Sequence, residues 1–399
     1  FSLKAMDAAN TWVINDVTGR EEGTLNGIEF VNFKTLIGGS GADTFDILGA
    51  FTGNINGNGG ADVFHIRKNI SGAIDGGAGD DSFMFYGSNR VDSGSIVGGT
   101  GSNTVDLTNA NDSVEIIAVG RTVYGVTDAT HIKSASNKNH RLKSNEDINN
   151  WVIKAVDVAG TLSDGINDGE INGLKFTDFN RLDGGEKINN FTFYTNFNGH
   201  IFTGQGDDNF HLNTHFTGNI SSGQGSDTFF FYDTGLVDLN KVDAGEDQDT
   251  INLTNLTEGR DVILGNGHLF NIKNVQRIVA DNSKAFSLRS TDANASWHIF
   301  DFDDDGDVAD GKNDGVVNGI KFVDFTTLYG SNYADVFTLD ADFVGKIYAG
   351  NGNNTFNINT TVKAELIGGA DNDTFVFSQG GQFDTASGGY GDGEGGFNT

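Results

Sequence analysis

The sequence predicts an all-β protein: a parallel β-helix, or β-solenoid, with coils of about 19 residues in three tandem modules of about 146 residues. Two nested repeat periods and an unusual composition support this prediction. The 399 residues include 57 Gly and no Pro. Without proline, the many turns must be built by Gly, Asn, Asp and Ser, the residues that tolerate positive φ or hydrogen-bond their own backbone.

The long period is marked by the motif Asn-Gly-x-x-Phe. It occurs at residues 26–30, 172–176 and 318–322, with 146 residues between successive copies. Each copy follows one of the three tryptophans, Trp12, Trp151 and Trp297. We therefore expect three solenoid modules in one continuous rod, the third one truncated. Their boundaries are 1–140, 141–285 and 286–399.

The short period is marked by an acid or amide that follows a glycine-rich turn. From Asp43 to Asp62 to Asp81 the step is 19 residues, and the next step, to Asn103, is 22. The second module repeats these steps and the third repeats the first two, through Asn189, Asp208, Asp227 and Asp249, and through Asp335, Asn354 and Asp373. A step of about 19 residues between equivalent positions indicates one coil of a solenoid.

Apolar residues recur with the same step and predict the strands. Phe45, Phe64 and Phe83 form one column, and a second column begins two residues later at Ile47. Inward-pointing positions two residues apart are typical of a strand. Each coil should therefore contain a strand, a short turn with Gly, a second strand and the wide glycine-rich turn. Segments 107–140 and 253–285 keep the alternation but lose the wide turn, so we expect irregular coils there. No helix is predicted.

The charge restricts the partners. The chain has 55 Asp and Glu but only 25 Lys and Arg, which gives a formal net charge of -30. This balance argues against nucleic acid and anionic membrane surfaces, both of which need Lys and Arg. It favours Ca²⁺, which takes oxygen ligands, although acidity can also serve solubility alone. The chain has no Cys, which excludes disulfides and thiolate metal sites. No apolar run reaches the roughly 20 residues of a membrane span, so no membrane insertion is expected.

The glycine-rich turns resemble a known calcium-binding repeat. Residues 38–45, 76–83 and 98–105 follow the pattern Gly-Gly-x-Gly-x-Asp/Asn-x-apolar, and 222–229 and 368–375 follow it with glycines lost. The pattern resembles the nonapeptide of RTX proteins. That resemblance implies Ca²⁺ held between successive turns by Asp carboxylates and turn carbonyls. The ligands it implies are Asp43, Asp62, Asp81, Asp208, Asp227, Asp249, Asp335 and Asp373.

The chain departs from the RTX pattern in two ways. The motif occurs once per 19 residues instead of in unbroken tandem, so at most one edge of the solenoid could bind metal. Asn replaces the acid at 103, 189 and 354, which lowers the charge available to a cation. The alternative interpretation is that Asp and Asn stabilise the turns by accepting hydrogen bonds from backbone N–H groups.

A second calcium-like pattern lies outside these turns. Residues 301–306 read Asp-x-Asp-x-Asp-Gly, which makes Asp301, Asp303 and Asp305 candidate ligands of an oxygen-rich loop. The bidentate Glu expected at position 12 of such a loop is absent, because that position is Lys312. A solvated acidic loop is the alternative.

In the first module Phe30, Phe33 and Leu36 precede the glycine-rich turn at three-residue steps, and the other modules repeat this order. With this pattern the whole module resembles the repeats of giant bacterial exoproteins, namely filamentous-haemagglutinin-like proteins and large RTX adhesins. The resemblance covers nearly all of the chain. It implies an extracellular or bacterial cell-surface location and a structural or adhesive shaft that works in adhesion, biofilm or extracellular matrix. The partners it suggests are calcium, host surfaces, matrix polysaccharide and neighbouring modules. A start at Phe1 instead of Met suggests a piece of a longer protein.

The sequence does not favour an enzyme, although parallel β-helices can carry polysaccharide-active sites. The paired carboxylates recur in register, which fits turns better than acid–base catalysis. Two alternatives to the shaft stay open. One is a carbohydrate-binding or polysaccharide-active β-helix, which would need an exposed aromatic groove. The other is a self-assembling extracellular filament subunit. The aromatic residues that could line such a groove are Tyr86, Tyr124, Tyr194, Tyr232 and Trp297.

Overall fold

The computed structural model confirms the all-β parallel solenoid. It describes residues 1–15, 18–88, 95–158, 161–238, 241–265, 268–291, 294–302, 312–378 and 380–387. Within these residues every regular element is a β-strand, and none of them belongs to a helix that could cross a membrane. The chain divides into two compact units. Unit 1 holds residues 1–205 and 217–219, and unit 2 holds residues 206–216 and 220–399.

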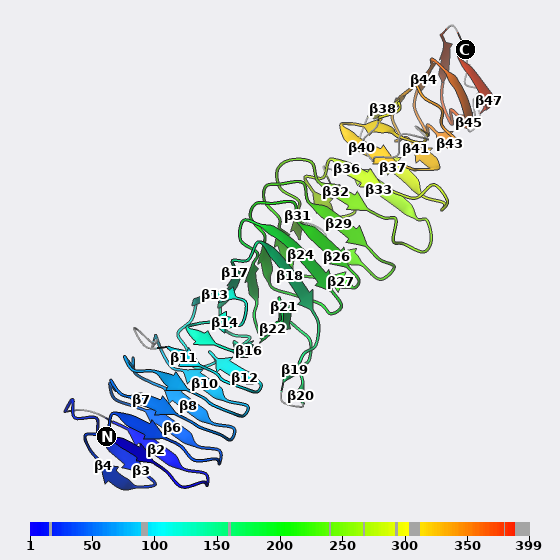
Figure 1. Cartoon of the computed structure of the whole chain (residues 1–399). Helices are drawn as coiled ribbons and strands as arrows, with labels where there is room; N and C mark the ends of the chain where they lie inside the picture. Colours follow the sequence, from blue (N-terminus) through cyan, green and yellow to red (C-terminus); the bar gives the residue numbers. More distant parts are fainter. Residues whose placement is uncertain are drawn as a thin grey trace. The chain divides into compact units, whose positions relative to one another are not determined.

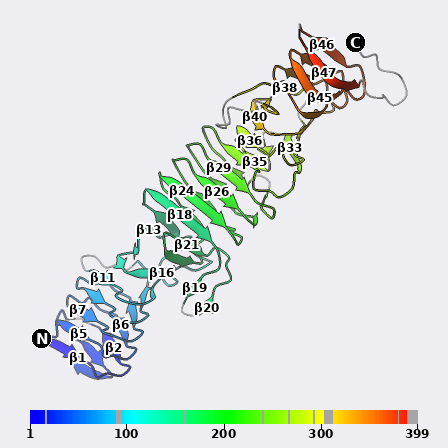
Figure 2. The same cartoon turned by 45° about the vertical axis from the view of Figure 1, so that its right-hand side comes forward.

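The strands of unit 1 form two sheets, which Figure 2 shows as separate layers near the N terminus. The first sheet contains β1 (Ser2–Lys4), β5 (Thr35–Ile37), β7 (Asn54–Asn56), β9 (Ile74–Asp75), β11 (Ile96–Val97), β13 (Glu115–Val119), β14 (Thr122–Val123), β15 (Val126–Thr127), β17 (Arg141–Ser144), β23 (Arg181–Asp183) and β25 (His200–Phe202). The second contains β2 (Thr11–Ile14), β3 (Gly23–Leu25), β4 (Ile28–Phe30), β6 (Thr44–Ile47), β8 (Val63–Ile66), β10 (Ser82–Phe85), β12 (Asn103–Asp106), β16 (Ala129–Lys133), β18 (Ile148–Ile153), β21 (Gly169–Ile171), β22 (Leu174–Thr177) and β24 (Ile188–Phe193). β19 (Asp157–Val158) and β20 (Thr161–Leu162) form a separate hairpin.

Unit 2 repeats the two sheets. Its first sheet contains β28 (Asn219–Ser221), β31 (Val242–Asp243), β33 (Asp261–Gly265), β34 (His268–Leu269), β35 (Ile272–Lys273), β37 (Ser287–Ser290), β41 (Thr327–Tyr329), β43 (Gly345–Tyr348), β45 (Thr361–Ile367) and β47 (Gln382–Ser387). Its second contains β26 (Asn209–Leu212), β29 (Thr228–Phe231), β32 (Thr250–Asn252), β36 (Arg277–Val279), β38 (Ser296–Ile299), β39 (Gly315–Val317), β40 (Ile320–Val323), β42 (Val336–Leu339), β44 (Thr355–Ile358) and β46 (Thr374–Phe377). β27 (His215–Phe216) and β30 (Leu236–Val237) pair separately.

Successive coils stack in the register that the 19-residue period predicts. β6, β8 and β10 are parallel neighbours, and Phe45, Phe64 and Phe83 are direct partners in the ladder (Figure 1). Across the coil, β7 follows a short turn that contains Gly53 and pairs with β5 and β9. These coils each consist of a strand, a short turn, a second strand and a glycine-rich turn, as the sequence indicates.

The core is a column of like side chains. Phe45, Phe64 and Phe83 are fully buried and stacked, with ring centroids 4.9 and 5.1 Å apart. The same arrangement in unit 2 joins Phe337 to Phe356, whose centroids are 5.1 Å apart. Parallel strands about 4.8 Å apart place identical rings in contact without any change of rotamer.

An antiparallel hairpin interrupts the parallel stack in each module, and the sequence analysis did not predict it. The Asn-Gly pair of the long-period motif is the hairpin turn between β3 and β4, with Asn26 at φ 50° and Gly27 at φ 81°. β3 also pairs antiparallel with β2. Such positive φ values at both turn residues are those that Asn-Gly favours in two-residue hairpins. The hairpins β21–β22 and β39–β40 repeat this geometry.

The hairpin covers the tryptophan of its module. Trp12 stacks on Phe45 with centroids 5.5 Å apart and meets Phe30 of β4 edge-on at 6.0 Å. Trp151 and Trp297 make the equivalent pair of contacts, and all three indoles are fully buried. The three tryptophans therefore have the same surroundings, which explains why they recur at the same place relative to the motif.

Candidate functional site

The predicted turn acids lie inside the solenoid and not on its surface. Their side chains point inward beneath the glycine-rich turns, and none is more than 1% exposed. They are Asp43, Asp62, Asp81, Asp208, Asp227, Asp249, Asp335 and Asp373. Asn103, Asn189 and Asn354 are buried in the same way. The structure thus brings the predicted residues of each unit together as columns, one member per coil.

These side chains bond one coil to the preceding one. The backbone N–H of Asp43 donates to Asp62 Oδ1 at 2.7 Å, and that of Asp62 donates to Asp81 Oδ1 at 2.9 Å. The N–H of Asp81 donates to Asn103 Oδ1 at 3.1 Å. The turns lack strand partners at these positions, so the side-chain oxygens satisfy buried N–H groups that would otherwise be unpaired. We call this arrangement the Asp/Asn ladder.

The ladder recurs in unit 2 with the same geometry. The backbone N–H groups of Asp208, Asp227 and Asp249 donate to Asp227, Asp249 and Gln276, and those of Ala295, Asp335 and Asn354 donate to Asp335, Asn354 and Asp373, over 2.6–3.0 Å. An amide oxygen therefore serves as well as a carboxylate oxygen. The substitution of Asn for Asp, which weakens the resemblance to a metal site, preserves the hydrogen bond of the ladder.

The ladder also explains the first glycine of the motif. A Cβ atom at Gly38, Gly57 or Gly76 would lie only 2.2–2.4 Å from the second carboxylate oxygen of the acid five residues later. A side chain is therefore excluded there by the inward-turned carboxylate. The last glycine of the motif is required for a different reason. Gly79 has φ 135°, and a Cβ atom there would lie 1.8 Å from the carbonyl oxygen of Gly60. Both constraints arise from turn packing.

Burial leaves part of the ladder chemically unsatisfied. The Oδ2 atoms of Asp62, Asp81 and Asp249 are buried without a hydrogen-bond partner. Burial raises the pKa of Asp62 and Asp249 to about 7 and that of Asp81 to about 6, from an ordinary value of 3.8. Neighbouring carboxylates add to this rise, and the backbone hydrogen bond opposes it. These carboxyls therefore favour a proton, or another positive charge, beside Oδ2.

The raised pKa values predict a stability that falls as the pH rises. A carboxyl with a higher pKa in the folded chain than in the unfolded chain stabilises the fold below about pH 4 and loses that contribution as the pH rises to about 7. In EDTA, the Tm should therefore be lower at pH 8 than at pH 5, measured by circular dichroism. The double variant Asp62→Asn/Asp81→Asn keeps the acceptors but cannot titrate, so its Tm should change less. An equal change in both proteins would contradict the prediction.

The ladder carboxylates alone could not complete a calcium site. One oxygen of each ladder carboxylate faces a backbone N–H, whereas Ca²⁺ requires 6–8 oxygen ligands. Among the residues that the structure describes, no group of three or more His, Cys, Asp or Glu side chains is placed to hold a metal ion. The orphaned Oδ2 atoms of Asp62, Asp81 and Asp249 are a feature that a cation would satisfy.

The second predicted calcium loop lies mostly outside the described residues. Asp301 is described and exposed, whereas Asp303 and Asp305 belong to the range 303–311, which the structure does not describe. The prediction for this loop therefore stays a prediction.

No protein-family model matches the chain, and a search of curated proteins returns no significantly similar sequence.

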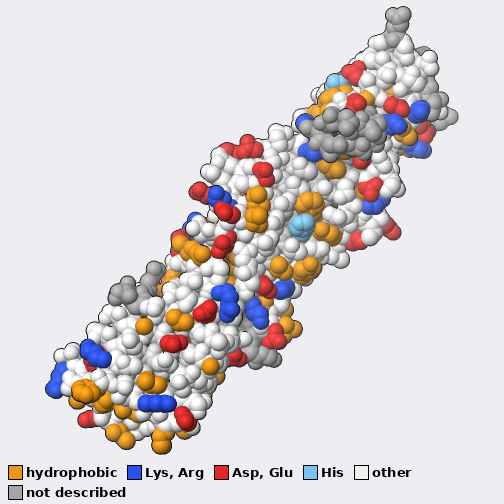
Figure 3. Space-filling model, viewed as in Figure 1, with side chains coloured by type: hydrophobic (Ala, Val, Ile, Leu, Met, Phe, Trp, Pro, Cys, Tyr) orange, Lys and Arg blue, Asp and Glu red, His pale blue; other side chains and the backbone are white. Residues whose placement is uncertain are grey.

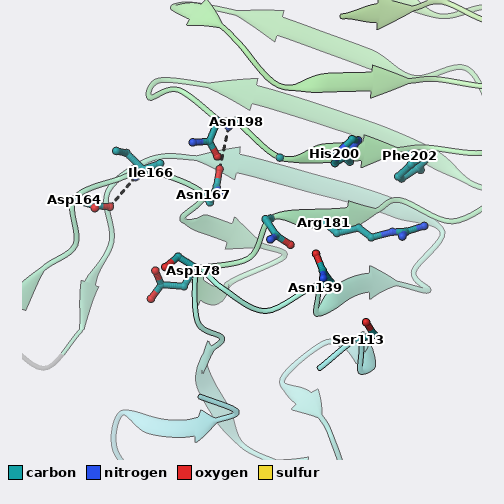
Figure 4. A pocket seen from close by; sticks show the side chains of 13 residues that line it. Ser113, Asn139, Asp164, Ile166, Asn167, Asp178, Arg181, Asn198, His200 and Phe202 are labelled. Carbon is teal, nitrogen blue, oxygen red and sulfur yellow. Dashed lines mark hydrogen bonds between the residues drawn. The ribbon is translucent and has the colours of Figure 1, made fainter. Parts of the chain in front are cut away.

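Unit 1 contains one further feature that the sequence analysis missed. A cavity of about 900 Å³ opens beside β23 and β25, and its lining includes Arg181, His200 and Phe202 (Figure 4). A signal for it was present, because these three positions break the repeat: the matching residues of the first module are Thr35, Asn54 and Asn56.

Proposed function

We propose that the chain is a structural, adhesive shaft segment of a large bacterial cell-surface or secreted repeat protein that works in adhesion, biofilm or extracellular matrix. The observation that carries the proposal is the Asp/Asn ladder. It adds a third line of bonds between coils, in the glycine-rich turns, beside the two parallel strand ladders. In a solenoid each coil contacts only its neighbours, so bonds between coils determine its resistance to unfolding.

The surface of the chain supports an extracellular shaft. Figure 3 shows acidic and basic side chains interspersed between broad areas of uncharged polar groups and backbone on the visible face. With a net charge of -30 the chains repel one another, which opposes non-specific association at high local density. The proposal assigns no catalytic step to the ladder, because its carboxylates are buried and repeat in register.

Calcium forms the second part of the proposal. At neutral pH the ladder holds several buried carboxyls whose Oδ2 atoms accept no hydrogen bond, and extracellular fluids supply Ca²⁺ in place of a proton. Asp62, Asp81 and Asp249 are the residues at which the ion would bind. Its positive charge would offset the burial of the carboxylates and so stiffen the turns.

Calcium removal should therefore lower the stability at neutral pH. At pH 8, millimolar Ca²⁺ should raise the Tm above its value in EDTA, because a ligand that binds only the folded chain stabilises it. Mg²⁺ at the same concentration is the control, since it demands stricter octahedral geometry. A Tm that is the same in Ca²⁺ and EDTA would show that Ca²⁺ does not stabilise the folded chain. The ladder would then consist of hydrogen bonds alone.

The location can be tested on cells that produce the protein. An antibody raised against this chain should label intact cells or their secreted matrix, and brief protease treatment of intact cells should remove the cell-bound label. An in-frame deletion of the chain should reduce surface attachment or biofilm mass. Labelling that appears only after the cells are permeabilised would overturn the proposal.

A further inference from the structure

The cavity in unit 1 runs across four successive strands of the first sheet. Its residues Ser113, Asn139, Arg181 and His200 lie at or just before the first residues of β13, β17, β23 and β25. These strands are parallel neighbours, so the four residues line one continuous edge. The opposite wall comes from the loop between β20 and β21 (Figure 4). At about 900 Å³ the cavity lies in the range of sites for organic ligands.

One end of the cavity combines a cation with two rings. The rings of His200 and Phe202 are nearly parallel, 10° apart, with centroids 6.3 Å from each other. The guanidinium of Arg181 lies 5.0 Å from the centre of the Phe202 ring. Figure 4 shows Arg181 extending along His200 toward Phe202. Arg181 and His200 are exposed and Phe202 is half-buried, so this end offers donors beside an aromatic surface.

The other end is rich in acceptors. Asp164 and Asp178 contribute carboxylates, and Asn180 and Asn198 add amide groups. In Figure 4 Asp164 and Asp178 lie on the loop side, away from Arg181, His200 and Phe202. Carboxylates only accept hydrogen bonds, the guanidinium only donates, and amides do both. The lining can therefore satisfy a ligand whose groups both donate and accept along its length.

Hydrogen bonds hold the loop wall in place. Asn167 Oδ1 accepts from the backbone N–H of Asn198 at 3.0 Å, and Thr195 Oγ1 donates to the carbonyl of Gly165 at 2.7 Å. The buried carboxylate of Asp168 accepts from the N–H groups of Gly165 and Asp178. A wall anchored in this way forms the cavity before a ligand arrives, which lowers the entropic cost of binding.

The modules share this scaffold but not the lining. The role of Asn167 is taken in the other modules by Glu21, which accepts from Thr52 N, and by Asn313, which accepts from Val344 N. Strand register equates Arg181, His200 and Phe202 with Thr35, Asn54 and Asn56 in the first module and with Thr327, Lys346 and Tyr348 in the third. A purely structural edge would repeat with its scaffold, so the change of lining indicates a role beyond the stack.

We propose that this cavity binds a neutral oligosaccharide. Sugar hydroxyls donate and accept at once, which matches the mixed lining, and the apolar face of a sugar ring suits the His200–Phe202 surface. The cavity lining includes Arg181 together with Asp164 and Asp178, a charge balance unsuited to a phosphate-rich or polyanionic ligand. The predicted aromatic candidate Trp297 plays no part, because it is fully buried in the core of unit 2.

Isothermal titration calorimetry on the full chain tests this proposal with three probes: cellohexaose, maltohexaose and chitohexaose. At least one should bind with a Kd below about 1 mM. The triple variant Arg181→Thr/His200→Asn/Phe202→Asn installs the residues of the first module, and its Kd should rise by at least about tenfold. The matched control, Lys346→Asn/Tyr348→Asn, changes the equivalent edge of the third module and should leave the Kd unchanged.

Two results would overturn the oligosaccharide site: no binding of any of the three probes, or an unchanged Kd in the triple variant. If the melting curve of the triple variant shows that it is not folded, the single variant Arg181→Thr decides, because Arg181 is exposed and its loss leaves the core intact. The shaft proposal is independent of this outcome, since surface labelling of cells does not depend on the cavity.

Discussion

Replacing Phe64 with alanine should lower the free energy of unfolding by about 3–5 kcal/mol. Phe64 is fully buried and stacks between Phe45 and Phe83, with interplanar angles of 4° and 7°. Alanine would leave a cavity that the flanking strands cannot close, because their separation is fixed by the parallel ladder. Since a coil of a solenoid contacts only its neighbours, the loss weakens two interfaces between coils at once.

Urea unfolding followed by circular dichroism measures this loss, and Leu48→Ala is the matched control. Leu48 directly follows β6 and is 42% exposed, so its truncation should change the stability by less than about 0.5 kcal/mol. If Phe64→Ala and Leu48→Ala lower the free energy of unfolding by the same amount, the aromatic column is not the core of the coil.

Replacing Asp43 with alanine should lower the free energy of unfolding by about 3–5 kcal/mol. Its carboxylate accepts from the backbone N–H groups of Asn10 and Gly39, both at 2.7 Å, and from the side-chain amide of Asn10, also at 2.7 Å. Alanine would leave buried donors unpaired, at about 1–3 kcal/mol each. The N-terminal turn would also lose its bond to the following coil.

Asp43→Asn separates hydrogen bonding from charge. Asn occupies the equivalent position at Asn103, where its Oδ1 accepts the N–H of the preceding coil. The Asn variant should therefore lose less than half of the stability that the Ala variant loses, in the same urea assay. An Asn variant as unstable as the Ala variant would show that the second carboxylate oxygen, which accepts from the Gly39 N–H, is required at this position.

The coils could be predicted from the sequence because their signal is redundant. Phe45, Phe64 and Phe83 recur with the same step as Asp43, Asp62 and Asp81, so that one register satisfies both series. Ladder partners in the structure follow that register. A shift by one residue would turn every Phe of β6, β8 and β10 out of the core, which is why the pattern specifies the stack so strongly.

The hairpins were missed although the sequence contains their signal. Asn26-Gly27 is a strong two-residue hairpin turn, and its return every 146 residues also marks the length of the module. The flanking strands β3 and β4 are only three residues long, too short for a pattern of alternation to stand out. For this element the turn residues Asn26 and Gly27 carry more information than hydrophobic periodicity does.

The two candidate sites show where sequence reasoning ends. The spacing of the turn acids is the same whether they bind a cation or accept N–H groups, because both roles need one inward oxygen per coil. The structure distinguishes the two roles, because the N–H groups of Asp43 and Asp62 each donate a hydrogen bond to one carboxylate oxygen of the next acid. The cavity combines four strand ends with the loop between β20 and β21, and no local pattern in the sequence joins them.

Hydrogen exchange at single-residue resolution tests the central claim, that the Asp/Asn ladder fastens each glycine-rich turn to the next coil. The backbone N–H groups of Asp43, Asp62 and Asp81 should be as protected as those of the strands β6, β8 and β10, although they lie in turns. Asp62→Ala should selectively remove the protection of the Asp43 N–H. Fast exchange of all three turn amides in the native chain, at the rate of exposed loops, would contradict the ladder and the proposed shaft built on it.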